Sequence, residues 1–208
     1  MVGVSALLNA SWKSYQNLIW QNKANMEARR ALDDICEVIR MSGNEPPTNT
    51  TLPYGYPQIR PDFVGTGFSY EIVVDVDQHG INTTNYVYAA QTAADGINYL
   101  VRMWNNSRIE SVAQFVDSVT FEYEYRQPDT SGGTTWQMHR VSKLEDFVNN
   151  GDLSIFHLIK TVYVTVNVRI PKNITGADKE YTRTLTSAVT LRGPYDDPAP
   201  PAQAYFPP

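Results

Sequence analysis

The stretch ALLNASWKSYQNLIWQNKANMEARRALDDICEVIRMSG, residues 6–43, decides the fold because its pattern predicts one long N-terminal helix. Apolar residues recur every three or four positions, which is the helical period; they are Leu8, Trp12, Tyr15 and Ile19, then Ala28, Leu32, Ile35 and Ile39. Gly43 and the two prolines that follow supply a stop signal. At about 1.5 Å per residue, this helix would be roughly 55–60 Å long. A single domain has no core of that length, so we expect part of the helix to project and contact something else.

Composition favours one globular body and argues against a nucleic-acid partner. The chain has 208 residues, with 17 Lys+Arg against 22 Asp+Glu and a formal net charge of −5, and no basic cluster that could follow a phosphate backbone. The single cysteine, Cys36, has no second cysteine to pair with. It lies beside the apolar stripe of the helix, so we expect a buried structural thiol.

After the helix the period changes from 3.6 to 2, which predicts antiparallel strands. The expected strands are 68–77, 85–90, 97–104, 116–126, 159–170 and 180–192, with a short returning strand from Trp136. Residues 112–115 lead directly into the strand 116–126. Glycines at positions 80 and 96 mark hairpin turns.

The pattern therefore predicts an α+β fold, with a long N-terminal α-helix packed on an antiparallel β-sheet domain. The expected division is a helix over 1–43, a β-rich domain over 44–192 and a Pro-rich tail over 193–208. Residues 44–61 and 171–178 are expected to be loops.

Several phrases of the sequence resemble type IV pilin-like proteins, closest to the minor pilins and to the J-type minor pseudopilins of type II secretion. The helix segment 22–44 ends in an "IR-x-x-G" phrase, through Ile39, Arg40 and Gly43. A later hairpin phrase runs through Tyr88, Gly96, Leu100 and Arg102, and a strand phrase through Val119, Phe121, Glu122 and Tyr123. With the two closing strands, these phrases stand in the order found in that family and cover most of residues 5–192.

The resemblance implies a structural subunit of a type IV pilus-like or type II secretion filament, without catalytic turnover or a cofactor. It implies a basic leader, a Gly–Phe cleavage site and a hydrophobic half-helix, of which residues 2–12 would be the outer end. The partners would be other pilin or pseudopilin subunits and, before assembly, the inner membrane of a bacterial envelope. The subunit-packing residues expected on this basis are Leu8, Trp12, Tyr15, Ile19 and Trp20. Contact of these residues with the chain's own body is the alternative.

An extracellular binding module or adhesin is the second hypothesis, and an enzyme is the third. Aromatic residues in loops would carry the binding module, with Tyr54, Tyr56 and Trp136 as candidates. The alternative is that these aromatic side chains cover an edge of the core. An enzyme has less support, because the sequence contains no G-x-S-x-G, P-loop or dinucleotide-binding motif.

Residues 75–82 (DVDQHGIN) are the one stretch with the look of a calcium loop. Asp75 and Asp77 are weak metal candidates, because an EF-hand needs an oxygen ligand at its fifth position and Glu at its twelfth. Those positions hold His79 and Tyr86. We therefore expect a solvated turn and no metal.

Overall fold

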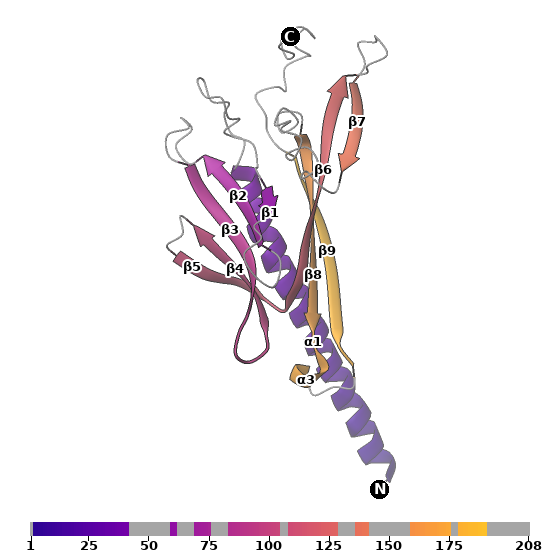
Figure 1. Ribbon diagram of the computed structural model, residues 1–208. Coiled ribbons are helices and arrows are strands. Elements are labelled where there is room, and N and C mark those ends of the chain that lie inside the picture. Colours follow the sequence, from indigo (N-terminus) through magenta and orange to yellow (C-terminus); the bar gives the residue numbers. More distant parts are fainter. Residues whose placement is uncertain are drawn as a thin grey trace.

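The computed structural model describes residues 2–41, 59–61, 69–75, 83–104, 108–128, 136–141, 159–175 and 179–190. One long helix, α1 (Val2–Met41), lies against two antiparallel sheets (Figure 1). The predicted α+β fold, with an N-terminal helix packed on antiparallel strands, is confirmed.

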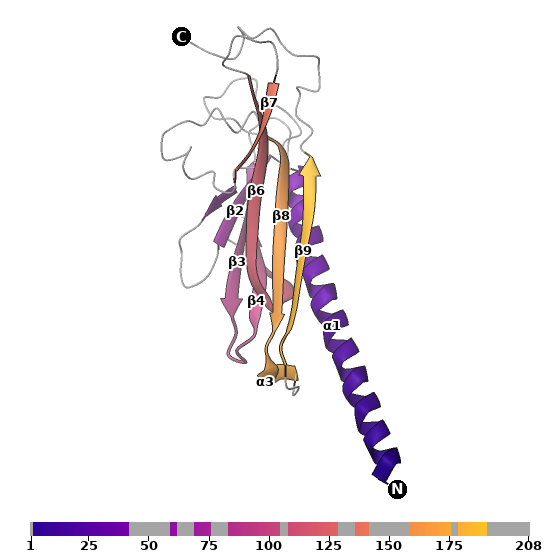
Figure 2. The ribbon, with the colours of Figure 1, turned by 90° about the vertical axis from the view of Figure 1, so that its right-hand side faces the viewer.

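Helix α1 has 40 residues, which at 1.5 Å per residue gives a rod of about 60 Å. Its C-terminal half packs on the sheets, chiefly on β8 and β9 and also on β5 and β2. Its N-terminal end extends beyond the body in both ribbon views (Figures 1 and 2). The prediction that the helix projects from the body is therefore confirmed.

The first sheet is a five-stranded meander in the order β1-β2-β3-β4-β5. Its strands are β1 (Ile59–Pro61), β2 (Ser69–Asp75), β3 (Thr83–Thr92), β4 (Asn98–Trp104) and β5 (Arg108–Gln114). The turn between β3 and β4 contains Gly96 at φ 76°, a backbone region that glycine enters at little cost. Strand β1 lies where the sequence predicted only loop; it can end on a proline because it is an edge strand.

The second sheet has four strands in the order β7-β6-β8-β9. They are β6 (Val116–Pro128), β7 (Trp136–Val141), β8 (Ile159–Ile170) and β9 (Tyr181–Thr190). A short helix, α3 (Lys172–Thr175), lies between β8 and β9, where the sequence predicted loop. The predicted strand at 159–170 and the returning strand from Trp136 are confirmed.

The chain passes from the first sheet to the second at Phe115, which the sequence pattern did not reveal. Phe115 has φ 61°, a conformation that is uncommon for a residue other than glycine. Its N–H donates to the Asn98 carbonyl at 2.5 Å, and its carbonyl accepts from the Arg169 N–H at 2.8 Å. Phe115 is thus hydrogen-bonded to β4 of the first sheet and to β8 of the second sheet.

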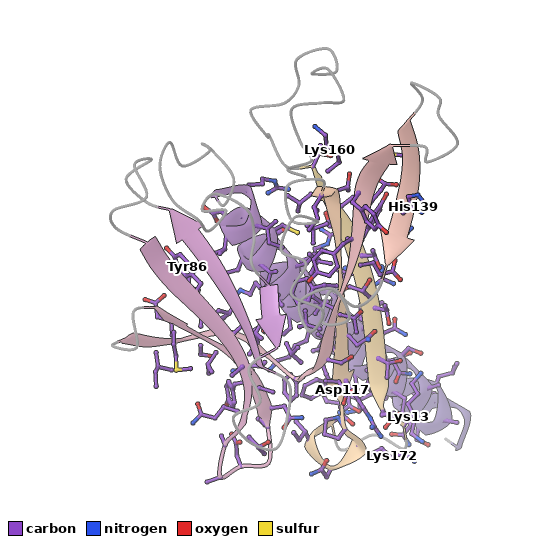
Figure 3. All side chains as sticks on the ribbon, turned by 45° about the horizontal axis from the view of Figure 1, so that its top comes forward. Lys13, Tyr86, Asp117, His139, Lys160 and Lys172 are labelled. Carbon is purple, nitrogen blue, oxygen red and sulfur yellow. The ribbon has the colours of Figure 1, made fainter. Side chains whose placement is uncertain are left out.

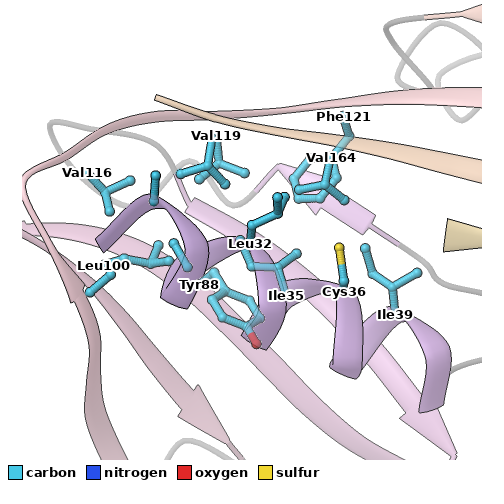
Figure 4. Packing of buried hydrophobic residues seen from close by; sticks show 14 of the residues in the cluster. Leu32, Ile35, Cys36, Ile39, Tyr88, Leu100, Val116, Val119, Phe121 and Val164 are labelled. Carbon is cyan, nitrogen blue, oxygen red and sulfur yellow. The ribbon is translucent and has the colours of Figure 1, made fainter. Parts of the chain in front are cut away.

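The hydrophobic core lies between α1 and the two sheets (Figure 4). Strand β8 contributes Val162, Val164, Val166 and Val168, which alternate with less buried residues. Helix α1 contributes small side chains, Ala24, Ala28 and Ala31, and then larger ones, Leu32, Ile35, Val38 and Ile39. The small residues allow the helix backbone to approach the strands closely, because each has only a methyl group to accommodate.

The opposite face of the second sheet is polar. Asn167 donates to Ser118 Oγ at 2.8 Å and accepts from Thr184 at 2.6 Å, and the hydroxyls of Thr165 and Thr186 are 2.9 Å apart. Cross-strand pairs of this kind support a sheet whose outer face meets water.

Enlarging one of the buried alanines should destabilise the protein. Ala28 is fully buried, so Ala28→Leu forces helix and sheet apart and should lower the free energy of unfolding by about 1–3 kcal/mol. Denaturant unfolding followed by tryptophan fluorescence measures this change. Ala10→Leu, at an exposed position of the same helix, is the matched control and should change the free energy by less than about 0.5 kcal/mol. Equal effects of the two substitutions would contradict the packing described.

Candidate assembly surface

The first two thirds of α1 expose a series of large apolar side chains. Their exposed fractions run from 44% to 70%, and they are Val4, Leu7, Leu8, Trp12, Tyr15, Leu18, Ile19 and Met26. Single exposed apolar residues are normal on a protein surface, but a contiguous series usually marks an interaction site. We call this set the outer stripe.

Most of the outer stripe faces away from the chain's own body, whereas Leu7 and Leu18 lie at its edge, near the rotation of the buried Cys36. At about 100° of rotation per residue, Val4, Leu8, Tyr15 and Ile19 fall within an arc of roughly 60°. The buried alanines and Ile35 fall on the opposite side of the helix axis. The helix therefore has two apolar faces, one that covers the core and one that is open to solvent.

The outer stripe ends at Met26, after which the same side of the helix becomes charged. The exposed charged residues in this second part are Arg29, Arg30, Asp33, Glu37 and Arg40. These charged residues belong to the part of the helix that packs on the sheets, whereas most of the stripe lies toward the projecting N-terminal end. Apolar and charged surfaces on the outer side of α1 are thus separated along its length.

Four of the five predicted packing residues belong to the outer stripe. Leu8, Trp12, Tyr15 and Ile19 are exposed, and the rings of Trp12 and Tyr15 lie with centroids 6.0 Å apart. Trp20 differs, because it is partly buried and packs against the core. The Lys23 ammonium lies 5.7 Å from the Trp20 ring and 5.0 Å from the Phe115 ring. The alternative of contact with the chain's own body therefore holds for Trp20.

The predicted packing residues did not include four members of the outer stripe, namely Val4, Leu7, Leu18 and Met26. Leu18 and Met26 continue the stripe at helical spacing, since Leu18 follows Tyr15 by three residues and Met26 stands two turns after Ile19. Their spacing was visible in the sequence. Which side of the helix they occupy relative to the body was not.

A hydrogen bond marks the point where the helix leaves the body. The Tyr181 hydroxyl, at the start of β9, donates to Asn17 Oδ1. Tyr181 is buried, whereas every residue from Val4 to Tyr15 is exposed. The projecting segment is therefore about three turns long within the described helix.

A polar cluster joins α1 to the first sheet and fixes the orientation of the helix. The Tyr88 hydroxyl donates to Asp34 Oδ1 at 2.5 Å, and Arg102 donates to Asp34 Oδ2 at 2.8 Å. Arg102 also donates to Glu110 Oε2 at 2.9 Å. Tyr88 and Arg102 stand directly opposite each other on β3 and β4. Both belong to the hairpin phrase that carried the family resemblance.

A second polar contact holds the crossover between the sheets. Glu27, which is 7% exposed, accepts a hydrogen bond from the Gln114 N–H at 2.9 Å. A carboxylate that bonds a backbone N–H is one of the stronger hydrogen bonds of proteins. The helix therefore contacts the backbone next to Phe115 directly.

Burial raises the pKa of two groups that pack between α1 and the sheets. The pKa of the Cys36 thiol is raised mainly by burial, and Cys36 is the buried thiol that was predicted. The pKa of Tyr88 is raised above its usual value by burial and, in addition, by the neighbouring Asp34 carboxylate.

The other predicted site residues lie mostly outside the described residues. Tyr54, Tyr56 and Asp77 fall there, as do the side chains of Trp136, which begins β7, and Asp75, which ends β2. Their proposed roles stay predictions. Among the residues that the structure does describe, no three His, Cys, Asp or Glu side chains are grouped so as to hold a metal ion.

Within the described part of the chain, no helix combines the length and the apolar character needed to cross a membrane. Comparison with protein-family models, with curated proteins and with solved structures found no match to this chain.

Replacing Tyr88 should make stability less sensitive to alkaline pH. Below pH 10 Tyr88→Phe should lower the free energy of unfolding by about 1.5–3 kcal/mol, because a hydrogen bond to a carboxylate is lost. Above pH 10 tyrosine ionises in the unfolded chain but not at the buried Tyr88, so the wild type loses stability as pH rises. The difference between the two proteins should shrink by up to about 1.4 kcal/mol per pH unit.

Urea unfolding of both proteins at pH 8, 9, 10, 10.5 and 11 tests this expectation. The remaining tyrosines are common to both proteins and cancel in the difference. A difference that stays constant from pH 8 to pH 11 would show that burial does not hold Tyr88 in its protonated form.

Proposed function

We propose that this protein is a structural subunit of a filament, a minor pilin or minor pseudopilin of a type IV pilus-like or type II secretion assembly. The outer stripe carries the proposal: a projecting helix exposes an apolar face on the side turned away from its own body. Subunits pack through this face, and the β body is displayed outward. The role is mechanical and needs neither catalytic turnover nor a cofactor.

The energetics favour burial of the outer stripe against neighbouring copies. Burying apolar surface contributes about 25 cal/mol per Å², and fully burying a Leu or Ile side chain contributes about 1.5–3 kcal/mol. The stripe contains eight large apolar side chains that are at least 44% exposed. Packing several of them at once therefore offsets the cost of ordering two subunits.

Helix-on-helix packing suits the shape of the stripe. The stripe covers about 140° of the helix circumference, and its residues recur mostly at three- and four-residue steps, which is the pattern by which one helix packs against another. The order of the five sequence phrases that resemble pilin-like proteins supports the same reading. The proposed setting is a bacterial envelope, with inner-membrane attachment before assembly and a periplasmic or surface location afterwards.

Cysteine crosslinking in cells that express the complete gene tests this function. Leu8→Cys and Tyr15→Cys place thiols on the outer stripe and should give disulfide-linked multimers after mild oxidation. The native Cys36 is buried and stays in place. The measurement is the fraction of multimer in non-reducing gels, which should be at least about tenfold above that of the wild type.

The matched control is Lys13→Cys, at an exposed position two residues from Tyr15 and turned by about 160° around the helix. It should give little multimer. If Lys13→Cys crosslinks as well as Tyr15→Cys, or if none of the three variants crosslinks, assembly through the outer stripe is wrong.

A further inference from the structure

Strand β9 forms an outer margin of the second sheet, and only one of its two edges is paired. Its ten residues pair with β8 in an unbroken register, and no other described strand pairs with it. Helix α1 packs on the inner face of β9, where Val189 is buried and Leu185 packs against the core; Figure 1 shows the helix passing behind β8 and β9. One row of backbone N–H and C=O groups therefore lies along an edge that is held in place but has no strand partner within the described chain.

The other described edge strands are shorter, and two of them carry features that prevent pairing. Natural edge strands are kept short, interrupted by proline, lysine or a bulge, or covered by another element. Strand β1 has three residues and ends at Pro61. On β5 the N–H of Gln114 is taken by Glu27 of α1, and β7 has six residues. Strand β9 has ten, with no bulge, proline, glycine or lysine, and its one charged residue is Arg183.

The side chains along β9 define the kind of segment that fits beside it. Alternate residues of a strand point to opposite faces. On the face toward α1, the exposed Arg183 is followed two residues later by the half-buried Leu185. The outer face presents the exposed hydroxyls of Thr182, Thr184 and Thr186. An added strand gains most from a carboxylate opposite Arg183 and an apolar side chain opposite Leu185, because directly opposed residues of these kinds stabilise a sheet.

We propose that the open edge of β9 binds an extended segment of a different protein, which joins the second sheet as a further strand. The occupant is an extended backbone, because another strand is what satisfies alternating N–H and C=O groups along an edge. A second copy of β9 fits less well, since β9 contains no Asp or Glu to place opposite Arg183. The partner segment therefore carries an acidic and an apolar residue two positions apart. This edge is separate from the outer stripe, so the inference goes beyond filament packing.

Amide hydrogen exchange with a designed peptide tests the open edge. The peptide is TVTVTET with blocked ends; antiparallel to β9, it places its Glu opposite Arg183 and its second Val opposite Leu185. In the protein alone, alternate amides between Thr182 and Thr190 should exchange fast, because their N–H groups have no strand partner. At a peptide concentration about ten times its Kd, these amides should exchange roughly tenfold more slowly, whereas the amides of β8 should not change.

Charge reversal tests the chemistry of the partner, with affinities measured by the fluorescence anisotropy of labelled peptide. Arg183→Glu should weaken the binding of TVTVTET roughly threefold to tenfold, and should strengthen the binding of TVTVTKT, in which Lys replaces Glu. The matched control is Lys172→Glu, which makes the same change of charge at an exposed position on α3. Lys172 lies at the end of the second sheet where β9 begins (Figure 3). This control should change both affinities by less than about twofold, because salt screens charges that are not in contact.

Three results would overturn the proposal. The first is slow exchange of every β9 amide in the protein alone, which would mean that the edge is already covered; light scattering then distinguishes a second copy from the chain itself. The second is a peptide that protects no amide of β9. The third is an Arg183→Glu protein with the same preference between the two peptides as the wild type. Crosslinking of Leu8→Cys and Tyr15→Cys reports on the outer stripe alone, so failure of the edge and failure of filament packing are distinguishable.

Discussion

The structure depends on the way one residue, Phe115, is held between three elements. Its left-handed backbone would be costly in isolation, because a bulky side chain at positive φ is strained. The cost is offset by the hydrogen bond that the Phe115 N–H donates to Asn98 and the one that its carbonyl accepts from Arg169. The Gln114 N–H also donates to the buried Glu27 of α1. Because β4, β8 and the helix all meet there, the relative placement of both sheets and α1 is set at this point.

The two sheets contact the helix in different ways, the second sheet through apolar side chains and the first sheet through hydrogen bonds and an ion pair as well. Valines of β8 and alanines of α1 give an apolar contact with little directional preference. The cluster of Asp34, Tyr88 and Arg102 adds directional bonds between charged and hydroxyl groups. Burial supplies most of the stability of such an interface, whereas the polar cluster permits one rotational setting of the helix and disfavours others, since a rotated Asp34 would lose both partners.

The sequence predicted the helix and most of the strands because period and turn residues are local signals. It did not predict the division into two sheets, since residues 112–126 contain no Gly or Pro to mark the crossover. The partnership of Asp34 with Arg102 joins residues 68 positions apart, which no local pattern encodes. Of the assembly surface, the spacing of Leu8, Tyr15 and Ile19 was visible, but Trp20 turned out to pack inward. Between Asn17 and Met26 both faces of the helix carry apolar residues, so periodicity alone could not say which one meets the body.

The charged residues on the outer side of α1, from Arg29 to Arg40, show which face of the whole helix is turned away from the body. Only one face of this C-terminal half can be buried, so its packing fixes the azimuth of the helix. Because the helix is continuous, its rotation about its own axis at the C-terminal end also fixes its rotation at the N-terminal end. The direction in which the outer stripe points is therefore set by packing centred roughly 30 Å from the middle of the stripe, at residues that do not belong to the stripe. Inserting one residue into α1 between the outer stripe and the C-terminal half would turn the stripe by about 100° relative to the body. Every side chain of the stripe would stay the same.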